Sequence, residues 1–144
     1  MKQNTTPFNT SKLIVTIVLL IIIGIFVTVL VKGINVDVTE ERVKIKGIYG
    51  REIRIEDIEE IRLLEKIPFP GMRLNGIGLG FINVGLYSYQ DIGKVIVFKT
   101  ATSDNNILII GKEEKVLLGL GQSKNEELYK KIMNAIEVYK KNNT

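Results

Sequence analysis

A long run of uncharged, almost entirely apolar residues limits what this chain can fold into. The run covers residues 13–31 and lies between Lys12 and Lys32. As a helix rising about 1.5 Å per residue, it is about 28 Å long, close to the roughly 30 Å hydrocarbon core of a bilayer. A core helix of a soluble protein is rarely apolar on all sides over this length. The run therefore predicts a transmembrane helix at residues 12–32, preceded by a short disordered tail at residues 1–11.

A cleaved signal peptide is the alternative interpretation of this run. Signal peptides have an apolar core of about 7–15 residues, followed by a cleavage site of small residues. Here the run is longer, and residues 31–35 read Val-Lys-Gly-Ile-Asn instead of an Ala-x-Ala pattern. We therefore expect an uncleaved anchor and a protein that crosses the cell membrane once, with the lipid bilayer as its first partner.

The positive charges on either side of the run predict its orientation. Cytoplasmic flanks of membrane helices carry an excess of Lys and Arg. The C-terminal flank has Lys32, Arg42, Lys44, Lys46 and Arg51, and the N-terminal flank has Lys2, Lys12 and the amino terminus. The immediate flanks carry one Lys each, so only the wider count favours one side. That count predicts that the C-terminal domain faces the cytoplasm.

The composition of the chain excludes several kinds of functional site. The sequence has no His and no Cys, so it lacks the usual general base at neutral pH, a thiol nucleophile and the commonest metal ligands. Residues 32–144 hold 18 basic and 16 acidic side chains. These charges are interleaved along the chain, whereas nucleic-acid binders gather basic side chains into a stripe. We expect no catalytic site, no metal site, no cofactor and no nucleic-acid partner.

After Lys32 the apolar residues alternate with polar ones, which is the period of a half-buried strand. The alternation predicts three short antiparallel strands, at residues 34–38, 43–46 and 53–56. At Asp57 the apolar spacing changes to three, which predicts a helical turn or a twisted strand. Pro68 and Pro70 then predict a loop.

The second half of the domain combines further strands with a C-terminal helix. Strands are predicted at residues 92–100, 107–110 and 116–120, with a turn at residues 103–106. Ser123 and Glu126 then match a capping box, which predicts where a helix begins. The apolar face of that helix consists of Leu128, Ile132, Ala135, Ile136 and Tyr139. We therefore predict a mainly β domain at residues 34–141, in which about seven strands form an open antiparallel barrel capped by the amphipathic helix.

Short motifs at defined places in this pattern carry a family resemblance. They are Ile48-Tyr49-Gly50-Arg51-Glu52-Ile53, Asp57-Ile58, Arg73-Leu74-Asn75-Gly76, Gly85-Leu86-Tyr87 and Gly93-Lys94-Val95. With the order of the elements, they resemble the bacterial pleckstrin-homology-like (PH-like) domains of small membrane proteins. The resemblance covers roughly residues 34–139 and implies a seven-stranded antiparallel barrel capped by a C-terminal helix. Members of this family mostly have no assigned activity, so the resemblance implies little about mechanism.

The candidate ligand-binding residues are Arg73, Asn75, Gly76 and Gly78. Arginine can form a bidentate pair with a carboxylate or a phosphate, and asparagine tolerates left-handed backbone while hydrogen bonding its neighbours. The alternative is that these residues only organise a loop, with Asn75-Gly76 as a turn and Arg73 paired to an acid such as Glu65. The glycines match neither a dinucleotide-binding nor a Walker sequence, so positive φ or a bulge explains them better than phosphate binding.

These features predict a membrane-anchored binding or assembly module rather than an enzyme. Such a domain can present a sheet edge or a rim to a peptide, a second copy or the membrane surface. We therefore expect a protein partner or a homo-oligomer. The alternative function is a sensor of anionic lipid or of a small ligand, acting through the Arg73-Asn75-Gly76 loop. An enzyme would need a cleft with polar groups that converge around Arg73, Tyr87 and Tyr89.

Overall fold

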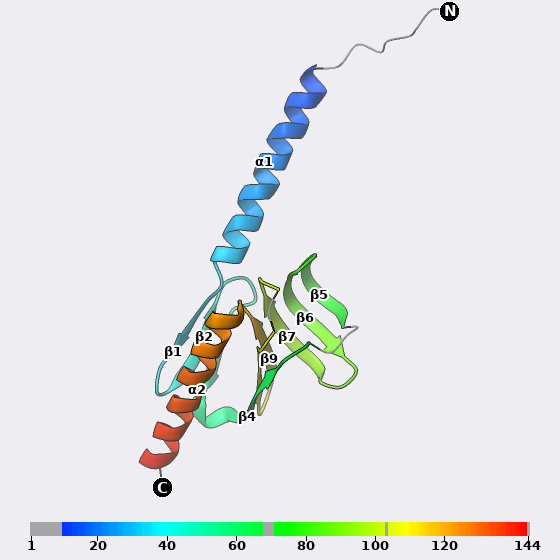
Figure 1. Cartoon of the computed structure of the whole chain (residues 1–144). Helices are drawn as coiled ribbons and strands as arrows, with labels where there is room; N and C mark the ends of the chain where they lie inside the picture. The colour runs from blue at the N-terminus through cyan, green and yellow to red at the C-terminus, as the bar shows by residue number, and fades with distance from the viewer. Residues whose placement is uncertain (1–9, 68–70, 103, 144) are drawn as a thin grey trace, which may run out of the picture. The chain divides into compact units, whose positions relative to one another are not determined.

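A computed structural model describes residues 10–67, 71–102 and 104–143 and divides the chain into two units, residues 1–32 and residues 33–144 (Figure 1). The first unit contains helix α1 (Thr10–Lys32). It begins two residues before the predicted span, and the rest of the predicted tail lies outside the described residues. The residues Thr10–Val29 are apolar and long enough to cross a bilayer, a property that α1 shares with signal sequences.

The polar side chains inside α1 satisfy their own hydrogen bonds. The Thr16 hydroxyl donates to the Lys12 carbonyl oxygen at 2.9 Å, and the Thr28 hydroxyl donates to the Gly24 carbonyl oxygen at 2.8 Å. Hydroxyls that bond back to the helix carry little penalty in an apolar environment. The two threonines therefore do not oppose insertion into lipid.

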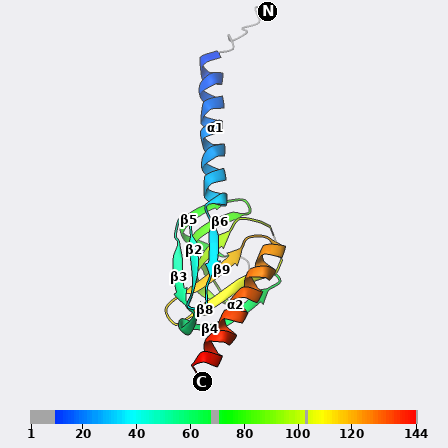
Figure 2. The ribbon, with the colours of Figure 1, turned by 90° about the vertical axis from the view of Figure 1, so that its left-hand side faces the viewer.

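The second unit has two sheets and a C-terminal helix (Figures 1 and 2). The small sheet consists of β1 (Asn35–Val38), β2 (Arg42–Lys46) and β3 (Arg51–Arg54), in that order. The large sheet has the order β4 (Ile58–Leu64), β8 (Asn106–Gly111), β9 (Lys115–Gly119), β7 (Gly93–Lys99), β6 (Ile82–Tyr89) and β5 (Met72–Leu79). The 3-10 turn η1 (Ile55–Asp57) links the two sheets, and α2 (Gln122–Asn142) follows β9.

The structure corrects two parts of the predicted barrel. The described residues form nine strands in two sheets instead of seven strands in one barrel, and β7 and β9 are parallel instead of antiparallel. Strand β5 was hidden by its glycines, which interrupt the alternation of apolar residues. The three-residue spacing from Ile58 to Ile61 comes from a bulge between Ile58 and Glu60, where β4 pairs with β8.

The domain core lies on both faces of the large sheet. On one face, α2 packs against β1, η1, β8 and β9, and Figure 1 shows it beside β1. The helix buries the predicted positions Leu128, Ile132 and Ala135. A cluster around Tyr87, Tyr89, Val95, Val97, Leu108 and Leu117 forms a second buried group. Because side chains alternate along a strand, Val95 and Val97 face away from the side to which Ile96 and Phe98 point. Strands β7, β8 and β9 are therefore buried on both sides.

The start of α2 differs from the predicted capping box. The N-cap is Gly121, and no side chain caps the helix there. Instead, the Leu120 N–H donates to Oδ1 of the buried Asn125 at 3.0 Å. Ser123 lies inside the first turn of the helix, which is why its side chain cannot act as the cap.

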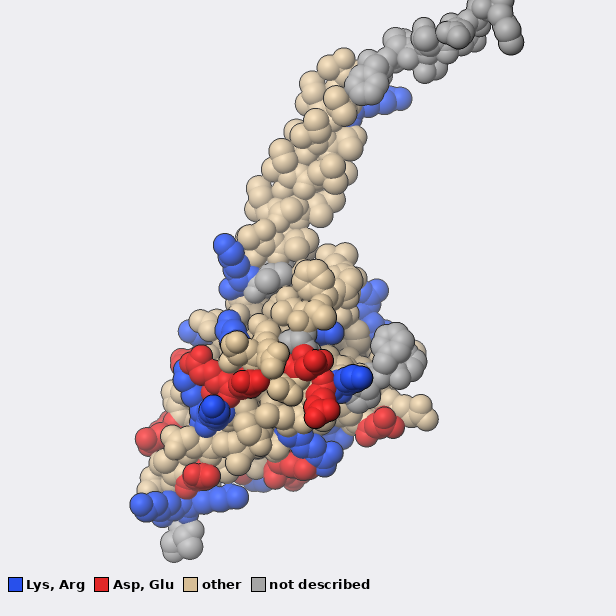
Figure 3. Space-filling model, in the orientation of Figure 1, with Lys and Arg blue, Asp and Glu red and all other residues tan. Residues whose placement is uncertain are grey.

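Acidic and basic side chains are interleaved over the visible surface of the domain, as the sequence predicts (Figure 3). Many of them form ion pairs, such as Arg42 with Glu52 at 2.7 Å and Lys131 with Glu127 at 2.7 Å. Exposed pairs of this kind contribute little to stability. The surface in this view shows no basic stripe of the type that binds nucleic acid.

Candidate functional site

The four predicted ligand-binding residues lie in strand β5 and not in a loop. Arg73 pairs with Tyr87 of β6, and Asn75 pairs with Leu86 after a bulge between Arg73 and Asn75. Gly76 and Gly78 follow in the same ladder. The predicted Asn75-Gly76 turn is therefore wrong, while the bulge and the positive φ expected of the glycines are present: Gly76 has φ 121°.

Gly76 and its partner Gly85 let two strands approach closely. A Cβ on Gly76 would lie 2.2 Å from the Val84 carbonyl oxygen, and a Cβ on Gly85 would lie 2.3 Å from the Asn75 carbonyl oxygen. Both residues also have positive φ, 121° and 138°. Packing of β5 on β6 therefore explains why glycine occupies both positions, and ligand binding by Gly76 stays a prediction.

Arg73 and Gly78 belong to a polar cluster on β5 and β6. The Tyr87 hydroxyl lies 3.1 Å from Asn83 Oδ1 and 3.2 Å from the Ile77 carbonyl oxygen, and both this hydroxyl and Arg73 Nη1 lie close to Gly78. A Cβ on Gly78 would lie 2.8 Å from Arg73 Nη1, so glycine leaves room for the guanidinium. Burial raises the pKa of Tyr87, and Arg73 partly opposes that rise.

The position of Arg73 bears on the alternative prediction that this residue is paired to an acid such as Glu65. Among the described residues Arg73 forms no ion pair with Glu65, because its guanidinium faces Tyr87. Asn75 instead accepts a hydrogen bond from the Tyr49 hydroxyl at 3.0 Å, which ties β5 to the turn between β2 and β3. Two of the predicted residues, Arg73 and Gly78, therefore come together, and Asn75 has a separate role.

A cavity of about 300 Å³ lies beside the two stacked tyrosines of β6. The rings of Tyr87 and Tyr89 are 6.4 Å apart at an interplanar angle of 21°. The other lining residues come from the end of β4, the start of β5, the end of β7 and the start of β8, and include Lys66, Gly71 and Lys99. Burial raises the pKa of both tyrosines, so they stay protonated at neutral pH and cannot act as bases there. Across the described residues, no three acidic side chains are placed to hold a metal ion.

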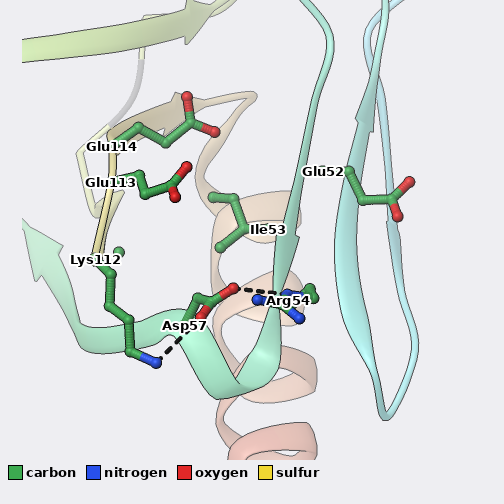
Figure 4. Close-up of a pocket in the computed structure, with 8 residues that line it drawn as sticks. Glu52, Ile53, Arg54, Asp57, Lys112, Glu113 and Glu114 are labelled. Carbon is green, nitrogen blue, oxygen red and sulfur yellow. Dashed lines mark hydrogen bonds and ion pairs between the residues drawn. The ribbon is translucent and has the colours of Figure 1, made fainter.

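A second depression, also of about 300 Å³, lies between β3 and the turn that joins β8 to β9 (Figure 4). Asp57 lies at its centre, between two cations: it accepts from Arg54 Nε at 2.8 Å and from Lys112 Nζ at 3.1 Å. Glu114, which also lines the depression, accepts from Arg51 Nε at 3.1 Å. The backbone N–H of Lys112 also donates to the Asp57 carbonyl oxygen. These contacts hold η1 against the β8–β9 turn, so the charged side chains here have a structural role.

Asp57→Asn is expected to destabilise the domain at neutral pH and to have no effect in acid. Hydrogen bonds from Lys112 and Arg54 lower the pKa of Asp57 in the folded state. Its ion pairs therefore stabilise the fold above the unfolded pKa of about 3.9 and are lost as the pH falls through the lower, folded value. Thermal unfolding of wild type and variant should give midpoints that differ at pH 7 and converge below about pH 4.

The exposed Asp91 provides the matched control for this prediction. Asp91 lies in the β6–β7 turn, and no ion pair or hydrogen bond of its side chain is present in the described structure. Asp91→Asn should leave the midpoint unchanged over the whole pH range. A difference for Asp57→Asn that is the same at pH 3 and pH 7 would show that the ion pairs do not stabilise the fold.

The fold and its motifs can be compared with known families. The family model described as Bacterial PH domain matches residues 34–134, which is more than half of the chain. The chain belongs to the bacterial PH domain family. The match lies inside the second unit and includes all the strands and the first half of α2. No curated protein and no solved structure matches the chain.

The two edges of the large sheet of this bacterial PH domain differ in protection. At one edge, β4 carries the exposed charges Glu59, Glu60 and Arg62 together with a bulge. Charges and bulges of this kind prevent an edge from pairing with another chain. At the other edge, β5 also has a bulge, between Arg73 and Asn75, but it carries a single charged side chain and exposes the apolar side chains of Met72 and Leu74, at 64% and 42%. The sequence did not reveal this edge, because its glycines made the strand resemble a loop.

Proposed function

We propose that this protein is a single-pass membrane protein whose bacterial PH domain is a non-catalytic module that binds a protein segment along β5. In this proposal α1 is an uncleaved anchor and the domain faces the cytoplasm. The length and composition of α1 support the anchor. The wider count of positive charges after residue 31 supports the orientation.

The apolar edge of β5, with a single charged side chain, is the observation that carries this proposal. The strand has eight residues, so it offers about 27 Å of extended backbone with one row of unpaired N–H and C=O groups. A partner strand would gain main-chain hydrogen bonds there, and Met72 and Leu74 would supply apolar contacts. Recognition by strand addition combines these two contributions.

The contacts at the two depressions support a non-catalytic role. The acids and bases around Asp57 are engaged with one another in ion pairs. The tyrosines of the other cavity are kept protonated by burial. A general acid or base needs a pKa close to the working pH, and the pKa of Asp57 is lowered while those of Tyr87 and Tyr89 are raised, each away from neutrality.

The anchor explains how a weak edge contact is sufficient. Two proteins held in the same membrane have a high effective concentration, so modest affinity gives a stable complex. The partner in this proposal is therefore another membrane protein or a second copy of this chain. An alternative function, a sensor of anionic lipid or a small ligand, ranks second because the Arg73 guanidinium packs beside Gly78 and the Tyr87 hydroxyl within its own sheet.

Photo-crosslinking from β5 in native membranes tests the proposal. The full-length chain carries a photoreactive amino acid in place of Leu74, and a matched variant carries it in place of Glu59 on the opposite edge. We expect an adduct from position 74 and none from position 59. Met72→Lys should lower the yield at least about tenfold, because a charge at an apolar contact costs more than about 1.4 kcal/mol.

The mass of the adduct identifies the type of partner. An adduct of twice the 16.2 kDa chain mass is a second copy, and any other mass is a different protein. Equal yields from positions 74 and 59, or a yield from position 74 that Met72→Lys does not change, would contradict binding along β5.

A further inference from the structure

Three exposed apolar side chains form a second surface, which we call the rim: Ile48, Leu79 and Phe81. We propose that the rim inserts into the headgroup region of the bilayer that α1 crosses and so seats the domain on the membrane. The inference rests on the anchor of the proposed function, and it concerns different residues from the Met72 and Leu74 contact. The rim side chains are 47%, 50% and 53% exposed.

Phe81 occupies a place where an apolar side chain is unusual. Leu79 pairs with Ile82, so Gly80 and Phe81 form a two-residue turn at the tip of the β5–β6 hairpin. Gly80 has φ 58°, as the first position of such a turn requires. Residues at turn tips are normally polar or glycine. A half-exposed phenylalanine at this tip therefore points to an apolar environment outside the domain.

Ile48 is likewise a central residue of a tight turn, the one between β2 and β3. The Gly50 N–H donates to the Gly47 carbonyl oxygen at 3.0 Å, so Ile48 and Tyr49 are the two central residues of this turn. Tyr49 has φ 66°, a value that a non-glycine residue rarely adopts. Its hydroxyl donates to Asn75 of β5 at 3.0 Å and holds the turn in place.

The two turns lie at the same end of the domain. Figures 1 and 2 both show the β2–β3 turn and the β5–β6 hairpin tip at the end where β1 begins. The hydrogen bond between Tyr49 and Asn75 connects the first turn to the hairpin. The surface over the hairpin is mostly uncharged in Figure 3. The two turns therefore expose their apolar side chains at the same end of the domain.

The chain itself brings this end of the domain to the bilayer. Gly33 and Ile34 are the only residues between α1 and β1, and two residues span at most about 7 Å. A Cβ on Gly47 would lie 3.3 Å from the Gly33 carbonyl oxygen, so the β2–β3 turn touches the first residue after α1. The turn that carries Ile48 therefore lies beside Gly33, the residue that directly follows α1 in the chain.

Charge placement agrees with a lipid surface as the occupant. Lys32, directly before Gly33, and Lys46, at the end of β2, are exposed. Cations near a membrane surface can form ion pairs with lipid phosphates. Apolar side chains that enter the boundary between headgroups and acyl chains, next to such cations, form the usual arrangement of a protein that lies on a membrane.

Single-cysteine probes test the rim directly, because the chain has no cysteine of its own. The full-length protein is reconstituted in phosphatidylcholine vesicles with an environment-sensitive fluorophore at Ile48→Cys, and quenchers are attached to the lipids. We expect quenching at least about twofold stronger than at Asp91→Cys, in the turn at the other end of β6. Phe81→Asp, added to Ile48→Cys, should remove the difference between the two probes.

A further probe in α1, at Ile22→Cys, separates the two proposals. Quenching at Ile22 without quenching at Ile48 would overturn the rim and leave the anchor intact. Absence of quenching at Ile22 would overturn the anchor itself. A blue-shifted Ile48 probe that the lipid quenchers do not reach would show that another copy covers the rim, against the inference. Quenching of the Ile48 probe only in vesicles with anionic lipid would show that charge, and not apolar insertion, binds the domain to the membrane.

Discussion

Gly85→Ala is expected to lower the free energy of unfolding of the domain by about 3–5 kcal/mol, or to prevent folding. The new Cβ would lie 2.3 Å from the Asn75 carbonyl oxygen and 2.6 Å from the Gly76 Cα, both backbone atoms that cannot rotate away. The φ of 138° adds strain of its own. Urea unfolding of the detergent-solubilised protein, followed by the near-UV circular dichroism of its five tyrosines, measures the loss.

Gly80→Ala is the control that separates backbone strain at positive φ from a steric clash of the new Cβ. Gly80 also has positive φ, 58°, but no heavy atom lies within 4 Å of a Cβ built there. Its substitution should therefore cost only about 1–2 kcal/mol, from backbone conformation alone. Equal losses for the two variants would mean that β5 and β6 can separate enough to accept a methyl group, and that the close approach of Gly76 and Gly85 is unimportant.

The double substitution Leu19→Arg and Leu20→Arg is expected to release the protein from membranes almost completely. Both positions lie near the middle of the apolar stretch Thr10–Val29. An arginine at the centre of a membrane helix costs about 2.5–3.5 kcal/mol, so the pair costs about 5–7 kcal/mol. Alkaline carbonate extraction should leave the wild type in the membrane pellet and move the variant to the supernatant.

Leu13→Arg is the matched control for the anchor. It lies one residue from Lys12, at the end of the stretch, where a long cationic side chain reaches the headgroups. This variant should stay in the pellet. A wild-type protein found in the supernatant, or a purified protein whose mass shows that residues 1–32 have been removed, would contradict an uncleaved anchor.

The strands of the small sheet were predictable because apolar and polar residues alternate along them. In β2 the apolar residues Val43 and Ile45 are buried while their neighbours are exposed, so alternation alone identifies the strand. In β5 the glycines satisfy a backbone requirement that is set by β6, a different part of the chain. A glycine required by a contact with another strand leaves no local apolar pattern, so β5 was missed.

The candidate site was predictable in its residues but not in their arrangement. Arg73 has a chemistry that points to a specific partner, and it has one in Tyr87. The partner follows from the register of β5 on β6 and from the bulge before Asn75, neither of which is encoded near Arg73. The unprotected β5 edge was missed for the same reason, since an edge is a property of strand order in the whole sheet.

The place of β9 in the large sheet has a consequence for how the protein is made. β9 lies between β7 and β8, yet it is the last strand along the chain. A chain synthesised only to residue 111 therefore contains α1 and eight strands but lacks the strand that joins β4–β8 to β5–β6–β7. Contacts between distant parts of a chain form slowly. The membrane helix is thus available for insertion well before the domain can close, and a nascent chain needs protection of its β7 and β8 edges until residues 115–119 emerge.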